Sequence, residues 1–322
     1  MEQIETVFHG FFQDKWTARG CNLTGWPHCP ENLRISKENA KLLNEEFTKE
    51  ELINVVFKQG NNKSPGLDGI TNSFFKFYWK IVGDDTWKAI EEFFKTGIMH
   101  NEWKDTLLVL IPKVKNPKQA AFLHGRSMSD HVLLAHEVFH KMKISKRKKG
   151  FMVVKLDMEQ AYDSMCWDTL FQVLNMFGFP MKLTMLIMEC IRNARFAFIL
   201  NGKNSKWIIA ENGFRQGCPL SPFLYVICSQ LLSLAIAQRG QDLGIQVSCR
   251  AHKISHLLFA DDVLLFSKAT KKLAVKMNKI VRDFCSWTGL RINISKSQIL
   301  FSKRINRMNR IHVMKILKFK LV

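Results

Sequence analysis

The stretch from Ile254 to Phe266 reads Ile-Ser-His-Leu-Leu-Phe-Ala-Asp-Asp-Val-Leu-Leu-Phe, so two adjacent aspartates, Asp261 and Asp262, lie inside an apolar run. The apolar flanks predict two short buried strands with the acidic pair at the tight turn between them. Neighbouring carboxylates repel each other, and a low local dielectric raises that cost, so a divalent cation is the natural compensation. Aspartate also favours turns in general, and the pair alone leaves that alternative open.

A second apolar strand is predicted over Phe151–Asp157, and it also ends on a carboxylate. We expect Asp157 to face the same cation as Asp261 across a small sheet. Carboxylate oxygens suit Mg²⁺, which keeps open positions for substrate phosphates instead of sitting in a complete protein cage. The sequence therefore predicts a magnesium site to which two separate strands contribute.

Helical spacing and capping signals predict helices in the rest of the chain. Thr48 and Glu51 have the pattern of a capping box, so a helix is expected to start there, whereas residues 1–40 show weak periodicity and are expected to be loosely ordered. Because strands and helices are mixed and segregated instead of alternating as βαβ units, the sequence predicts an α+β fold. Further helices are predicted at 74–79, 86–94, 130–142, 170–177 and 220–237, and a strand at 107–111.

Two more blocks complete a pattern with the aspartates. The block Ala-Tyr-Asp at 161–163 follows Asp157, and the block Arg-Gln-Gly-Cys-Pro-Leu-Ser-Pro at 215–222 lies between it and the acidic pair. Three blocks in this order are a strong signal, unlike any one of them alone. With them the chain resembles the reverse transcriptase domain of non-LTR (LINE-type) retrotransposons, and within these a plant lineage.

The resemblance implies a right-hand polymerase architecture of fingers and palm, in which a small antiparallel palm sheet packs on helices. It implies an N-terminal lead-in at 1–44, fingers at 45–150, and a palm at 151–303 with part of the fingers inserted between the first two palm motifs. Residues 304–322 are expected to be a truncated tail without a thumb, so that the chain resembles a fragment of a full element.

The resemblance also implies the chemistry of the acidic site. Asp157 and Asp261 match the two ligands that bridge both Mg²⁺ ions, and Asp262 matches the supporting carboxylate, with Mn²⁺ as an alternative ion. One ion lowers the pKa of a primer 3′-hydroxyl while the other holds the triphosphate, and in-line attack on the α-phosphorus releases pyrophosphate.

Four further residues are expected to contact the substrate. Tyr162 resembles the steric gate that selects deoxynucleotides, and Gln216 resembles the residue that contacts the incoming nucleotide. Lys113 resembles a triphosphate-binding lysine, and Lys296 resembles the palm lysine that approaches the leaving pyrophosphate. Two plainer alternatives stay open, ordinary core packing for Tyr162 and a simple surface position for Lys296.

The charge of the chain indicates a polyanionic partner. The formal net charge is +20 and the pI is about 9.7, which suits phosphate contacts by lysine and arginine, so an RNA template and a DNA primer are the expected partners. An anionic membrane surface is the alternative, but no apolar run approaches the ~20 residues that a spanning helix needs. The acidic start of the chain disfavours a secretory leader, and the oligomeric state cannot be inferred.

The cysteines and one basic run bear on the cellular compartment. Eight cysteines without Cys-x-x-Cys pairs favour a reducing compartment. A zinc site at Cys21, His28 and Cys29 is disfavoured because no second ligand pair follows at zinc-finger spacing. The resemblance implies the nucleus, and the basic run at 146–149 adds weak support.

One departure from the family pattern bears on activity. In the family a segment of a few dozen residues follows the triphosphate lysine, but here Lys113 is followed almost directly by the block that starts at Ala120, so a piece is missing near 119–120. Its loss would remove a second cation from the triphosphate and leave the strand at 107–111 with an unpaired edge. Three hypotheses follow: an active RNA-directed DNA polymerase, a decayed nucleic-acid-binding remnant, and a domesticated RNA-binding scaffold. The survival of all three aspartates disfavours the scaffold.

Overall fold

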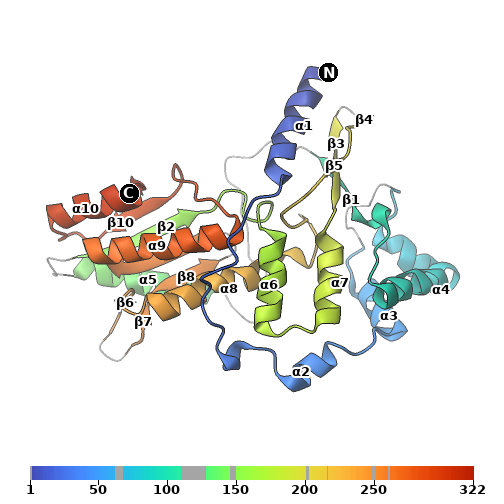
Figure 1. Ribbon diagram of the computed structural model, residues 1–322, viewed down its shortest axis with the longest axis horizontal. Helices are drawn as coiled ribbons and strands as arrows, with labels where there is room; N and C mark the ends of the chain where they lie inside the picture. Colours follow the sequence, from blue (N-terminus) through green and yellow to red (C-terminus); the bar gives the residue numbers. More distant parts are fainter. Residues whose placement is uncertain are drawn as a thin grey trace. The chain divides into compact units, whose positions relative to one another are not determined.

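The computed structural model describes residues 2–61, 68–109, 128–145, 150–200, 203–215, 217–248, 251–259 and 262–322 (Figure 1). The chain divides into two compact units. The first contains the described parts of 1–18, 30–113 and 174–215, and the second those of 19–29, 114–173 and 216–322. Both combine helices with small sheets instead of alternating strand and helix, which confirms the α+β class.

The N-terminal helix α1, Glu2–Trp16, belongs to the first unit. Trp16 is only 3% exposed and stacks on Phe196 with ring centroids 4.2 Å apart, while Phe12 packs on Phe198 at 4.3 Å. The expectation of a loosely ordered lead-in was therefore wrong for this segment. Two aromatic side chains one helical turn apart make the contact, and they leave no continuous apolar stripe for periodicity to detect.

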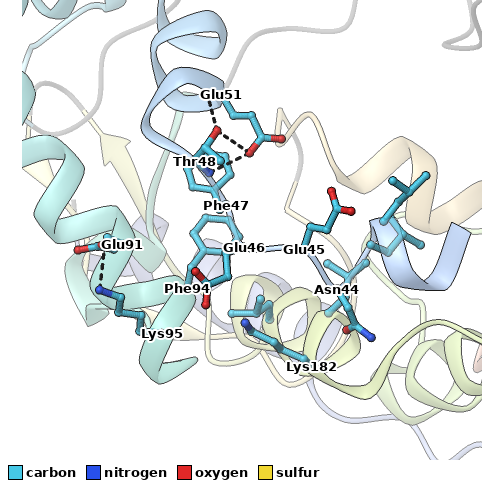
Figure 2. A pocket seen from close by; sticks show the side chains of 14 residues that line it. Asn44, Glu45, Glu46, Phe47, Thr48, Glu51, Glu91, Phe94, Lys95 and Lys182 are labelled. Carbon is cyan, nitrogen blue, oxygen red and sulfur yellow. Dashed lines mark hydrogen bonds and ion pairs between the residues drawn. The ribbon is translucent and has the colours of Figure 1, made fainter. Parts of the chain in front are cut away.

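The predicted capping box starts α3, Lys49–Lys58. The hydroxyl of Thr48 accepts from the backbone N–H of Glu51 at 3.2 Å, and the Glu51 carboxylate accepts from the Thr48 N–H at 2.9 Å, as Figure 2 shows. The same turn lines a cavity of about 340 Å³ beside Phe47 and Phe94. None of the predicted site residues lines this cavity.

A single helix, α4 (Asn72–Thr96), replaces the two helices that we predicted at 74–79 and 86–94. It is kinked at Tyr78, whose φ of −100° and ψ of 17° leave the helical region. The remaining helices of the first unit are η1 (Glu31–Leu33), α2 (Lys37–Leu42), η2 (Asn101–Lys104) and α7 (Met181–Ile191), and the sequence patterns predicted none of them.

The sheet of the first unit contains β1 (Asp105–Val109), β3 (Arg195–Leu200), β4 (Lys203–Asn204) and β5 (Ile208–Ile209). β1 pairs with β3 in parallel, and their first residues form a bidentate ion pair, Arg195 to Asp105, at 2.6 and 2.7 Å. The predicted strand at 107–111 is thus present, although it starts earlier and is described only to Val109. Within the described part of the chain, β1 pairs on one side only, so it is an edge strand.

The main sheet of the second unit contains β2 (Phe151–Asp157), β8 (His256–Phe259), β9 (Asp262–Lys268), β10 (Gln298–Phe301) and β11 (Lys320–Leu321). Its order is β11-β10-β2-β9-β8, and β2 lies in the middle between antiparallel neighbours. The strand Phe151–Asp157 and the antiparallel hairpin around the acidic pair are both confirmed. A separate two-stranded ribbon pairs β6 (Ile245–Gln246) with β7 (Lys253–Ile254).

The helices of the second unit are α5 (Met128–Ile144), α8 (Ser221–Arg239), α9 (Lys271–Thr288) and α10 (Arg307–Leu317), and α6 (Trp167–Phe177) runs across the boundary between the units. The predicted helices at 130–142, 170–177 and 220–237 match α5, α6 and α8. Among the described helices, α8 alone is long and apolar enough to cross a membrane by length and composition. Its nine buried residues show that it meets this criterion as a core helix of the unit.

Candidate functional site

The face of the main sheet that carries Asp157 is apolar and buried at one end and polar and accessible at the other. At one end, Phe151 and Val153 of β2 pack with Phe266 of β9 and with two residues of α5 in one buried cluster. At the other end of the same face, Lys155 and Asp157 are exposed and half-buried respectively, because side chains alternate along a strand. The polar end is therefore accessible to solvent, while its scaffold is fixed by a packed core.

Asp157 and Asp262 meet at this polar end. They are register partners on β2 and β9, in an antiparallel ladder that runs without interruption from Phe151 paired with Lys268. Direct cross-strand partners point to the same face with Cβ atoms about 4.5–5.5 Å apart. The two blocks that the sequence predicted to converge do lie side by side.

Lys155 forms an ion pair with Asp262. Its Nζ lies 2.9 Å from a carboxylate oxygen, and the two side chains are 46% and 54% exposed. Lys155 precedes Asp157 by two positions, so the period of the strand places both on one face. The chain thus supplies a cation to one of the predicted metal ligands.

A turn at Asn293–Ser297 fixes the end of β2. The backbone N–H of Asn293 donates to the carbonyl of Asp157 at 2.8 Å, and the Asp157 N–H donates to the hydroxyl of the fully buried Ser297 at 3.1 Å. Both backbone groups of Asp157 are therefore satisfied by one turn. Lys296 lies in this turn, and its backbone N–H donates to the Asn293 side chain at 3.2 Å. The Lys296 side chain is exposed, next to the residues that hold Asp157.

Tyr162 is half-buried and stacks on Tyr225 of α8, with ring centroids 4.7 Å apart and an interplanar angle of 30°. Tyr225 is 2% exposed and forms a rigid base for the Tyr162 ring. Core packing thus positions this side chain.

Three predicted site residues, Asp261, Gln216 and Lys113, lie outside the described residues, as do the basic run at 146–149 and the junction near 119–120. Their roles remain predictions. The neighbour of Gln216, Gly217, has a φ of +84°, a conformation that side chains other than glycine rarely adopt. The glycine of the block at 215–222 is therefore required by backbone conformation.

The residues present fit a divalent cation. Two carboxylates share one sheet face at its polar end, and a cation bound there would compete with Lys155 for one of them. Carboxylate oxygens on an accessible surface are the ligands that Mg²⁺ and Mn²⁺ accept while keeping further positions free.

Sequence reasoning missed Lys155 and Ser297. The alternation of β2 could have indicated Lys155, because it lies two positions before Asp157. No local signal could have revealed Ser297, since its contact joins positions 140 residues apart.

Residues 97–315 match the family model described as reverse transcriptase (RNA-dependent DNA polymerase). The chain belongs to the reverse transcriptase family. The match spans every predicted site residue, from Lys113 to Lys296. Members of this family generally use divalent metal ions.

Two of the curated relatives are proteins of transposable elements. The chain is 25% identical to the transposon TX1 uncharacterized 149 kDa protein of Xenopus laevis over 82% of its own length and 23% of that protein. It is also 25% identical to the Pol polyprotein of the type-2 retrotransposable element R2DM of Drosophila melanogaster, over 56% of this chain and 16% of that polyprotein. The predicted relationship to the reverse transcriptase domain of non-LTR retrotransposons is confirmed, and the chain spans under a quarter of either relative.

Among solved structures, a telomerase of Candida tropicalis truncated from its C-terminal domain is 14% identical with a TM-score of 0.41. That similarity covers 77% of this chain and 46% of the telomerase chain.

Proposed function

We propose that this reverse transcriptase domain catalyses RNA-directed DNA synthesis, in which the 3′-hydroxyl of a DNA primer attacks the α-phosphorus of a deoxynucleoside triphosphate on an RNA template. The observation that carries the proposal is the pairing of Asp157 with Asp262 at the accessible end of the main sheet. Family membership indicates the reaction class, and the paired carboxylates of Asp157 and Asp262 indicate where the reaction would take place.

In this proposal Asp157, Asp261 and Asp262 would hold two Mg²⁺ ions. When bound, the ions would supply the positive charge that acidifies the primer hydroxyl and neutralises the triphosphate. The turn at Asn293–Ser297 holds the backbone of Asp157 in place through the hydrogen bonds at 2.8 and 3.1 Å. Lys155 holds the carboxylate of Asp262 until the cations compete for it.

The remaining predicted residues contact the substrates. Tyr162, supported from behind by Tyr225, lies under the sugar and leaves no room for a 2′-hydroxyl. Gln216 contacts the incoming nucleotide and Lys113 its triphosphate. Lys296, exposed on the turn beside Asp157, approaches the leaving pyrophosphate.

We assign the second compact unit to the palm and the first to the fingers. Support comes from residues 174–215, which lie between the first two palm motifs in sequence and belong to the first unit. Nuclear action and a plant lineage are part of the proposal and follow from the resemblance alone.

Primer extension on an RNA template tests the function. The 322-residue chain should add deoxynucleotides in the presence of Mg²⁺ or Mn²⁺, and Asp157→Asn or Asp261→Asn should abolish the addition. Asp85→Asn is the matched control, because Asp85 is a carboxylate on α4 with its side chain 85% exposed. Extension that survives both aspartate changes contradicts the proposal.

A nucleic-acid-binding remnant without turnover is the second candidate, and the ion pair between Lys155 and Asp262 favours it. A lysine on a metal ligand neutralises the charge that a cation needs. This candidate predicts salt-sensitive RNA binding together with no incorporation at any Mg²⁺ or Mn²⁺ concentration. Detectable, metal-dependent extension excludes it.

A further inference from the structure

Residues 19–29, here called the strap, belong to the second unit and form hydrogen bonds with its helices at several points. The N–H of Asn22 donates to the carbonyl of Ser286 at 2.8 Å, and the indole N–H of Trp287 donates to the carbonyl of Thr24 at 3.1 Å. The N–H of His28 donates to the side chain of Gln238 at 3.0 Å. These bonds fix the strap on the ends of α8 and α9.

Cys21 in the strap contacts Cys166, which precedes α6. The two Sγ atoms lie 2.7 Å apart, although the residues are separated by 145 positions. Cys166 is buried and Cys21 is half-buried. The backbone N–H of Cys166 donates to the carbonyl of Thr288 at 2.9 Å, so both thiols are attached to the same end of α9.

We propose that Cys21 and Cys166 are a thiol-oxidation site, and that a low-molecular-weight disulfide such as oxidised glutathione converts them into a disulfide that fastens the strap to the segment between Asp163 and α6. This pair differs from the zinc site at Cys21, His28 and Cys29 that the sequence disfavours. In the structure Cys21 lies with Cys166 and Asp168 instead.

The geometry favours a disulfide over a metal ion shared by the two thiols. Two sulfurs on one tetrahedral Zn²⁺, with Zn–S bonds of ~2.3 Å, lie roughly 3.8 Å apart. The observed contact of 2.7 Å, in which the Cys166 thiol donates to Cys21 Sγ, is shorter than that separation. A metal ion bound by both thiols would have Asp168 as its third ligand, and that carboxylate belongs to an exposed residue.

The reaction is a two-step thiol–disulfide exchange. The thiolate of the more accessible Cys21 attacks one sulfur of oxidised glutathione and displaces one glutathione thiolate. The thiolate of Cys166 then attacks the Cys21 sulfur of the mixed disulfide and displaces the second glutathione thiolate. The two cysteines lose two electrons and two protons in total, and the reagent disulfide gains both as two glutathione thiols.

Burial and the hydrogen bond with Cys166 raise the pKa of Cys21 to about 11. Because only the thiolate reacts, the exchange is slow near pH 7 and accelerates as the pH rises toward that pKa. The disulfide between Cys21 and Cys166 therefore forms under sustained oxidation, and both cysteines remain thiols under reducing conditions. Once formed, it closes a long loop and restricts the unfolded chain.

Peptide mapping under non-reducing conditions tests the site. The folded 322-residue chain is incubated with oxidised glutathione at pH 7 and pH 9, alkylated, and digested with trypsin. The expected product is a cross-link between the peptide of residues 20–34 and that of residues 156–182, formed faster at pH 9 and assigned to Cys21 by fragmentation. The oxidised chain should melt roughly 5–10 °C higher than the reduced chain.

Cys21→Ser should abolish the cross-link, and Cys285→Ser, which removes another half-buried thiol, should leave it intact. Fragmentation of the cross-linked wild-type peptides identifies the two bonded cysteines by itself, so the test does not depend on the folding of a variant. Three outcomes overturn the proposal. The first is a cross-link from Cys166 to Cys228, a fully buried thiol whose pKa is raised by burial and by Cys166. The second is mixed glutathione adducts without a cross-link, and the third is protection of both thiols from alkylation by one equivalent of Zn²⁺.

Discussion

Asp157 and Asp262 face each other as register partners on β2 and β9, two neighbouring strands of the main sheet. The first comes from an apolar strand and the second from a hairpin more than a hundred positions later in the chain. Cross-strand partners generally have Cβ atoms about 4.5–5.5 Å apart, and with Mg–O bonds of ~2.1 Å one cation would be able to reach a carboxylate on each strand. The pairing of these two residues brings two sequence blocks together into one candidate metal site.

Lys155→Met should tighten the binding of Mn²⁺ to this site. The lysine holds the Asp262 carboxylate at 2.9 Å and competes with a bound cation. An exposed ion pair contributes about 0.2–1 kcal/mol, so its removal should raise the affinity by about 1.4–5-fold. Titration followed by the EPR signal of free Mn²⁺ measures the change. Lys268→Met, at the other end of the same pair of strands, is the matched control and should change nothing. A weaker affinity in Lys155→Met would show that the lysine positions the carboxylate instead of competing for it.

Ser297→Ala should destabilise the second unit and reduce DNA synthesis together. The change removes the acceptor of the Asp157 N–H in a fully buried position, which costs about 1–3 kcal/mol of unfolding free energy. Urea denaturation measures the loss. Ser295→Ala removes an exposed hydroxyl from the same turn and should stay within about 0.5 kcal/mol of the wild type. Equal stability of the two variants would show that the bond to Asp157 contributes little.

Tyr162→Ala should raise the incorporation of ribonucleotides relative to deoxynucleotides, because the aromatic ring no longer excludes the 2′-hydroxyl. Tyr162→Phe keeps the ring and its stacking on Tyr225, so it should retain the preference for deoxynucleotides. Single-nucleotide incorporation with each substrate class measures the ratio. If Tyr162→Ala lowers both rates without changing their ratio, the side chain serves packing alone.

Sequence patterns predicted the elements that are encoded in short stretches of residues. The apolar runs before Asp157 and around the acidic pair predicted β2, β8 and β9, and the side chains of Thr48 and Glu51 predicted the start of α3. Features that depend on distant contacts were not predictable. Trp16 makes α1 part of the first unit by stacking on Phe196, and no periodic stripe accompanies it.

The residues of the candidate site also divide into those that local sequence predicts and those that depend on distant contacts. The convergence of Asp157 with Asp262 was predictable because both end or begin strands that must pair. The support of Asp157 by Ser297 and the contact of Cys21 with Cys166 join positions far apart in the chain. Serine and cysteine carry no signal of such partners in their local sequence.

The stability of the chain should fall as the pH drops below about 6.5, and His256 should contribute to this loss. Its ring nitrogens lie 2.9 Å from Ser255 Oγ and 3.0 Å from Ser233 Oγ, and burial lowers its pKa. The unfolded chain then binds the proton more readily than the folded chain, so stability decreases as the pH falls through the unfolded value toward the folded one. Urea midpoints at pH 7.5 and 5.5 measure the slope. His256→Gln should flatten it, whereas His252→Gln, at an exposed position, should leave it unchanged.

Binding of Mn²⁺ to the wild type and to Asp157→Asn tests the central claim most directly, because it reads the carboxylate pair without requiring turnover. Asp157→Asn should weaken the tightest Mn²⁺ site at least about tenfold, since even changes beyond the direct ligands of a metal cost that much. Asp85→Asn, the exposed control on α4, should bind as the wild type does. Equal Mn²⁺ affinity in all three proteins would contradict the assignment of Asp157 and Asp262 to one metal site.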